Sequence, residues 1–350
     1  MDHAELLIPG LLIAIAALSA IANAIDVPYP ILLVLGGLAL GFVPGIPQVE
    51  LDPELVLVIF LPPLLYSAAF FSSLRDLRRD LRTISTLAIG LVLATMVTVA
   101  VVAHTLIDGM PWAVAFVLGA IVSPTDPLAA SAIARRLNAP RRMVTITEGE
   151  SLVNDGTALV AYKVALGAVA GSFSLLDAGW DFVLSAAGGV AIGIAVGYVV
   201  AAIRRRLDDP QVEITISLFT GYAAYVPANE LGLSGVLAAV ACGIFMGWRA
   251  PQLTTPTTRM QSYSIWEILV FLVNATLFVL VGLQLNTIVD SLRGGYSAAT
   301  LIAWGAAISA VVIATRAVWL QVITFLIRTL DRRPSQLARR GTWRVRVANS

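Results

Sequence analysis

Two neighbouring apolar segments carry acidic residues at positions where a membrane-spanning helix would place them in hydrocarbon. The first segment contains Asp126, and the second contains Glu148, Glu150 and Asp155. A single acid near the centre of a bilayer costs about 2.5–3.5 kcal/mol. Four unpaired acids would therefore cost on the order of 10 kcal/mol, and intramembrane acids of this kind usually mark the path of an ion or a proton.

Two prolines, Pro124 and Pro127, bracket Thr125 and Asp126 in the first segment. Proline removes a backbone donor and disfavours helix in the residue before it, so this pair predicts an unwound stretch near the middle of the helix. Broken helices at membrane depth survive where their freed carbonyls line a cavity or bind an ion. The oxygen atoms of Asp126 and Thr125 suit a hard monovalent cation. The alternative is a simple kink in which Asp126 caps the second half of the helix.

The second segment presents two polar faces when its residues are placed about 100° apart on a helix. Glu148, Ser151 and Asp155 share one face, and Glu150 and Asn154 share another. We expect the face of Asp155 to line an ion cavity, since a carboxylate there can hold either a proton or a cation. In the alternative reading, Asp155 is a structural acid paired with Lys163, although Lys163 lies near the outer end of the segment, where lysine usually reaches toward water.

A basic residue inside a later apolar segment, Arg316, is the natural partner for the face of Glu150. An ion pair between them would neutralise one of the intramembrane acids and hold two helices together. Glu148 lies near the inner end of its segment, where it can also simply be solvated.

The composition excludes a soluble globular protein, because 58% of the residues are hydrophobic and only 13% are charged. The net charge of +1 gives no indication of nucleic-acid binding. With one cysteine, Cys242, no disulfide can form within the chain, and two histidines argue against a histidine-based metal site. No nucleotide or metal-binding motif is present, so we expect no cofactor and no resident metal beyond a transported cation.

Eleven apolar segments are long enough, or nearly so, to span a bilayer. A topology with the N-terminus outside and the C-terminus inside puts nearly all of the 23 basic residues in inner loops and the tail, as the positive-inside rule requires. The sequence therefore predicts an all-α polytopic membrane protein. The expected spans are roughly residues 5–25, 29–46, 53–73, 82–106, 112–134, 143–170, 180–203, 212–228, 232–249, 262–286 and 298–328.

The motifs resemble those of the monovalent cation/proton antiporters, a family that includes the sodium/proton exchangers. The resemblance rests on Ser123-Pro-Thr-Asp-Pro127 and on Glu150-Ser-Leu-Val-Asn-Asp-Gly156, which is highly specific. Phe60-Leu-Pro-Pro-Leu-Leu65 and Thr315-Arg-Ala317 are also similar to this family. The resemblance extends from about residue 5 to the end of the chain.

The resemblance implies an inverted-repeat fold with a broken fifth helix, a homodimer, and an elevator-like exchange of Na⁺ or Li⁺, or of K⁺, for protons across the plasma membrane. It implies that Asp155 is the exchanged site, surrounded by Asp126, Thr125 and Ser151. Glu150 and Arg316 would support the site as an ion pair. The pair Asn154-Asp155 resembles the electroneutral branch of the family, because a neutral Asn154 removes one proton site.

The chain departs from the family pattern after the eleventh span, where a second broken helix is expected. We therefore expect a transmembrane antiporter domain over residues 1–330 that is incomplete at its C-terminus, followed by a basic cytoplasmic tail over residues 331–350. Two other functions remain open at this point. One is a truncated fragment that does not transport, and the remote one is an intramembrane aspartyl protease that uses Asp126 and Asp155 as its catalytic pair.

Overall fold

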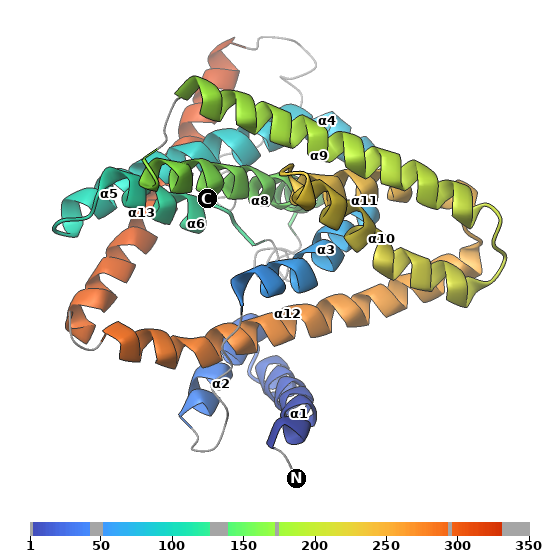
Figure 1. Cartoon of the computed structure of the whole chain (residues 1–350), viewed down its shortest axis with the longest axis horizontal. Helices are drawn as coiled ribbons and strands as arrows, with labels where there is room; N and C mark the ends of the chain where they lie inside the picture. Colours follow the sequence, from blue (N-terminus) through green and yellow to red (C-terminus); the bar gives the residue numbers. More distant parts are fainter. Residues whose placement is uncertain (1–2, 43–51, 127–138, 172–174, 293–295, 331–350) are drawn as a thin grey trace. The chain divides into compact units, whose positions relative to one another are not determined.

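The computed structural model describes residues 3–42, 52–126, 139–171, 175–292 and 296–330, and over these residues its regular elements are all helices. Within the described residues, each of the eleven expected segments overlaps a helix (Figure 1). The helices are α1 (His3–Ala24), α2 (Tyr29–Gly41), α3 (Pro53–Phe71), α4 (Leu74–Ser85), the π-helix η1 (Thr86–Leu91), α5 (Val92–Leu106), α6 (Trp112–Val122), α8 (Arg141–Val169), α9 (Leu175–Arg204), α10 (Pro210–Glu230), α11 (Gly235–Leu253), α12 (Pro256–Leu292) and α13 (Ala298–Leu330).

Seven described stretches are long and apolar enough to cross a membrane, and the continuous run from α4 through α5 counts as one of them. Helices α1, α2 and α6 are shorter and also apolar. The expected all-α polytopic membrane fold is therefore confirmed. One boundary differs from the expectation, because helix begins at Leu74 and not near residue 82. The extra turns belong to α4, whose leucines and arginines alternate with helical spacing and suit the edge of a membrane.

The described residues form two compact units. The first comprises residues 3–42, 52–74, 186–292 and 296–297, and the second comprises residues 75–126, 139–171, 175–185 and 298–330. The tail expected over residues 331–350 lies outside the described residues, as does Pro127.

Helices of the first unit come close together through glycine. A side chain at Gly37 of α2 would meet the carbonyl oxygen of Val279 of α12, and one at Gly282 would meet that of Val34. Close backbone approach through small residues is the usual way in which helices pack in a membrane. The core of this unit contains the fully buried ring of Trp266, whose Nε1 donates a hydrogen bond of 3.1 Å to Ser217.

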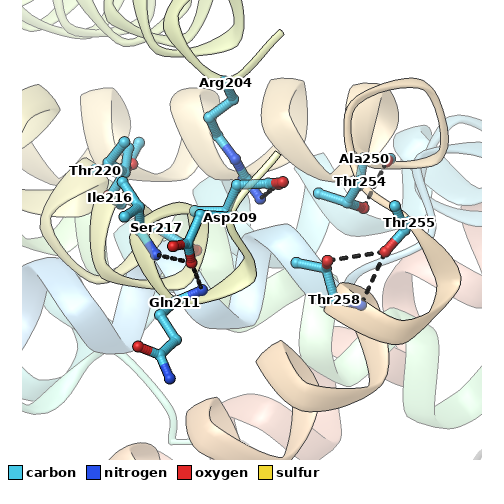
Figure 2. Close-up of polar contacts among 12 residues, drawn as sticks. Arg204, Asp209, Gln211, Ile216, Ser217, Thr220, Ala250, Thr254, Thr255 and Thr258 are labelled. Carbon is cyan, nitrogen blue, oxygen red and sulfur yellow. Dashed lines mark hydrogen bonds and ion pairs between the residues drawn. The ribbon is translucent and has the colours of Figure 1, made fainter. Parts of the chain in front are cut away.

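Two helices of this unit begin with side-chain caps, which Figure 2 shows. At the start of α10, the carboxylate of Asp209 accepts hydrogen bonds from the backbone N–H groups of Gln211 (2.8 Å) and Val212 (3.3 Å). At the start of α12, the hydroxyl of Thr255 accepts one from the N–H of Thr258 (3.2 Å). Such caps satisfy N–H groups that the helix itself leaves without partners.

The second unit contains the two segments that carry the intramembrane acids. In this unit α6 packs closely on α5, because Gly119 leaves no side chain between the two backbones; a Cβ there would meet the carbonyl of Met96. The π-helix η1 makes a similar contact with α13, where Gly90 faces the ring of Trp319.

A first prediction follows from the contact between α6 and α5. We expect Gly119→Ala to destabilise the protein by about 1–3 kcal/mol, since the added methyl group meets a backbone carbonyl that cannot turn away. The matched control is Gly305→Ala on α13, where a Cβ meets nothing within 4 Å. The measurement is the thermal unfolding of both variants in detergent. Equal melting temperatures for the two variants would show that α5 and α6 do not pack in this way.

Candidate functional site

The helix before Asp126 ends where the two prolines predict an unwound stretch, and the second half of the expected broken helix lies outside the described residues. Helix α6 ends at Val122, and Ser123, Pro124, Thr125 and Asp126 follow without helical structure. The hydroxyl of Ser123 donates back to the carbonyl of Ala120 at 3.0 Å and closes the end of the helix. Since Pro124 cannot continue the backbone hydrogen bonds, the chain unwinds and exposes the polar atoms of Thr125 to the neighbouring helix α8.

Thr125 links the unwound stretch to both polar residues on one face of α8. Its hydroxyl donates a hydrogen bond of 3.2 Å to Oε1 of Glu150. The amide Nδ2 of Asn154 donates to the same hydroxyl at 3.1 Å and to the carbonyl oxygen of Thr125 at 3.3 Å. Because the hydroxyl has a single hydrogen and gives it to Glu150, it can only accept from Asn154, which fixes the orientation of the Asn154 amide.

The expected ion pair between Glu150 and Arg316 is present. Nη1 of Arg316 lies 2.6 Å from Oε1 of Glu150, and Nη2 lies 3.0 Å from Oε2, so the contact is two-pronged. The side chain of Glu150 is 3% exposed and that of Arg316 is 19% exposed. With three hydrogen bonds, counting that of Thr125, the carboxylate of Glu150 is compensated in charge and fixed in place.

Asp155 has a different environment from Glu150. It is partly exposed, and within the described part of the chain it forms no ion pair or side-chain hydrogen bond. Ser151 is buried one turn earlier on the same face. The carboxylate of Asp126, which is exposed, lies near enough to Asp155 for the two like charges to interact. The structure thus places the carboxylates of Asp126 and Asp155 within electrostatic reach of each other beside the unwound stretch that follows α6.

The alternative pairing of Asp155 with Lys163 is not found in the described residues, where the side chain of Lys163 is exposed. Among the expected site residues, the structure brings Thr125, Glu150, Asn154 and Arg316 into one hydrogen-bonded network. The hydroxyl of Thr125, which was expected beside the cation, donates to Glu150 and accepts from Asn154.

Sequence reasoning missed a second ion pair, between Asp80 of α4 and Arg142 in the first turn of α8. The side chain of Asp80 is 2% exposed and accepts hydrogen bonds from Nε and Nη2 of Arg142 at 2.9 and 2.6 Å. A signal for it was available, since Leu77, Asp80 and Ile84 have the spacing of one helical face. An acid on the apolar face of an amphipathic helix predicts a buried partner.

Comparison with known proteins identifies the class of this fold and site. The family model of the transmembrane sodium/hydrogen exchangers matches residues 10–345. The chain belongs to the sodium/hydrogen exchanger family. This is a family of transporters and not of enzymes, and the intramembrane protease hypothesis finds no support.

Particular relatives agree with this assignment. The chain is 38% identical over 355 residues to an uncharacterized Na⁺/H⁺ exchanger of Mycobacterium tuberculosis (strain ATCC 25618 / H37Rv), covering 98% of this chain and 64% of the relative. It is 36% identical over 290 residues to a sodium, potassium, lithium and rubidium/H⁺ antiporter of Bacillus subtilis, covering 80% of this chain and 43% of the relative. The chain therefore spans less than two thirds of the length of these curated relatives.

A solved structure shows the same fold. The sodium proton antiporter MjNhaP1 of Methanocaldococcus jannaschii matches with a TM-score of 0.75 over 100% of this chain and 82% of that chain, at 20% sequence identity. The antiporter-type fold expected from the motifs is thereby confirmed.

Proposed function

We propose that this chain carries out secondary active exchange of a monovalent cation, Na⁺ or Li⁺ with K⁺ as a further candidate, for protons across the plasma membrane. The observation that carries the proposal is the pair of Asp126 and Asp155 beside the break in α6. The neighbouring Glu150 is already compensated by Arg316, which supports Asp155 as the acid that changes its occupant, with Asp126 within electrostatic reach of it. In the cell such exchange would contribute to sodium balance and internal pH.

In this proposal Asp155 holds either the cation or the proton, and Asp126, Thr125 and Ser151 supply further oxygens. Asn154, Glu150, Arg316, Pro124 and Pro127 support the site without exchanging. The oxygen set suits an alkali cation because hard cations prefer carboxylate, hydroxyl and carbonyl ligands. Since Asn154 is neutral, one proton would trade for one cation, and flux would not depend on the membrane potential.

The proposal extends to the assembly and its placement. Residues 1–330 would form a single transport domain in a homodimer, with the N-terminus outside and the C-terminus in the cytoplasm. This orientation is supported by the arginines of the inner loops and by the acids of the outer ones.

The test is proton flux in inverted vesicles that contain the 350-residue chain, recorded after addition of Na⁺, Li⁺, K⁺ or the large organic cation N-methylglucamine. We expect Na⁺ and Li⁺ to collapse an imposed proton gradient and N-methylglucamine to leave it intact. Repeating the assay with the membrane potential clamped to zero checks the one-for-one exchange. Well-inserted protein that shows no flux with any alkali cation would overturn the proposal for this chain.

A further inference from the structure

The first observation concerns the inner end of α8, the helix that carries Glu150, Asn154 and Asp155. Its first turn contains Arg141 and Arg142 and no acid. Two positive charges at this end are unfavourable, because the N-terminus of a helix itself carries a partial positive charge. The end of α8 therefore needs a negative charge from elsewhere in the unit.

Asp80 of α4 supplies that charge from a buried position. One of its oxygens accepts hydrogen bonds from both Nε and Nη2 of Arg142, and the other accepts a hydrogen bond of 3.2 Å from Nε of Arg79. The side chain of Asp80 is 2% exposed, whereas those of Arg142 and Arg79 are 42% and 44% exposed. A buried carboxylate with three charge-assisted hydrogen bonds is well fixed, and the arginines around it are held by it.

The same face of α4 contacts α8 again two turns further along. Leu77 and Ile84, which flank Asp80 on this face, both lie against Gly149, where a side chain on α8 would collide with them. Gly149 directly precedes Glu150, the residue that binds Arg316 and Thr125. Helix α4 thus contacts α8 at Arg142 and at Gly149, which are separated by about 10 Å along the helix axis.

Two contacts at different heights fix both the rotation and the axial position of a helix. Rotation of α8 decides whether Glu150 and Asn154 meet Thr125 while Asp155 faces the break in α6. From these contacts we propose that Asp80 is a positioning residue for cation binding, which acts through Arg142 to hold α8 in the orientation that the site requires. This inference rests on the proposed function and adds to it a residue far from the exchanged ion.

The experiment compares Asp80→Asn with Asp76→Asn in the vesicle flux assay. Asp76 lies on the same helix, but its side chain is 37% exposed and forms a 3.4 Å ion pair with Arg79. We expect Asp80→Asn to raise the KM for Na⁺ about tenfold and to leave Vmax per inserted protein little changed. Tenfold is about the lower end of the loss of affinity seen when a residue that holds a metal ligand in place is replaced. Asp76→Asn should keep the KM of the unmodified chain.

A second pair of variants covers the case in which Asp80→Asn does not insert. Asp80→Glu keeps the charge and should restore most of the affinity for Na⁺. Arg142→Lys keeps a positive charge next to Asp80 but loses the paired hydrogen bonds from Nε and Nη2. We therefore expect the KM for Na⁺ of this variant to rise, as it does in Asp80→Asn. Arg142→Lys with the KM of the unmodified chain would overturn the inference.

Amide hydrogen exchange of purified protein tests the positioning without reference to transport. We expect residues 149–155 to exchange faster in Asp80→Asn than in Asp76→Asn. The positioning role would be overturned if amide hydrogen exchange over these residues were unchanged. It would also be overturned if Asp80→Asn lost stability and Vmax together while its KM for Na⁺ stayed the same. Absence of flux in the unmodified chain would overturn the proposed function alone, since the exchange measurement still decides whether Asp80 orders α8.

Discussion

Replacing Asp155 with asparagine is expected to abolish cation-driven proton flux while leaving the protein folded. Asparagine has the same shape but cannot take up a proton, and its neutral oxygen offers a cation far less attraction than a carboxylate does. Asp155 forms no ion pair in the described part of the chain, so its replacement leaves no buried partner charge behind. The measurement is flux in inverted vesicles at several Na⁺ concentrations, normalised to the amount of inserted protein.

The matched control for this experiment is Asp108→Asn, which removes a carboxylate from an exposed position between α5 and α6. We expect this variant to transport as the unmodified chain does. A second comparison, Asp126→Asn, should weaken cation binding, since Asp126 lies within electrostatic reach of Asp155. If Asp155→Asn kept its exchange activity, the exchanging carboxylate would have to be another residue, and the proposed role of Asp155 would be wrong.

The sequence was sufficient to predict those parts of the site that depend on local chemistry. Two prolines around Thr125 predict the end of α6 because proline breaks helices regardless of what surrounds it. The pairing of Glu150 with Arg316 was predictable on energetic grounds. A charge within an apolar segment is costly unless an opposite charge lies next to it, and the structure contains this ion pair.

Other parts of the site depend on contacts between segments and could not be predicted from local pattern. The hydrogen bonds of the Thr125 hydroxyl with Glu150 and Asn154 depend on how α8 packs against the unwound stretch, which no local pattern indicates. The fourth span was expected to begin near residue 82, but helix α4 begins at Leu74. Its apolar face buries Leu77 and Ile84 against α8, and that burial stabilises the helix despite its charge.

The second large effect is expected from Glu150→Gln, which removes the charge of the buried carboxylate that Arg316 contacts. Removing one partner of a buried pair costs about 3–5 kcal/mol, because the remaining charge stays out of water. Arg316 is 19% exposed, so we expect the lower part of this range. The measurement is the melting temperature in detergent together with flux in vesicles, and we expect both to fall.

A double variant separates the charge of Glu150 from its other contacts. In Glu150→Gln with Arg316→Met, no buried charge is left alone, and the side-chain amide oxygen can still accept the hydrogen bond from Thr125. We expect the double variant to melt closer to the unmodified chain than either single variant, as is common when a whole buried pair is replaced. Lys163→Gln on the same helix, an exposed position, serves as the control. If Glu150→Gln and Arg316→Met had the melting temperature of Lys163→Gln, Glu150 and Arg316 would not hold α8 to α13. If the double variant lost as much stability as the two single variants together, each residue would act through other contacts.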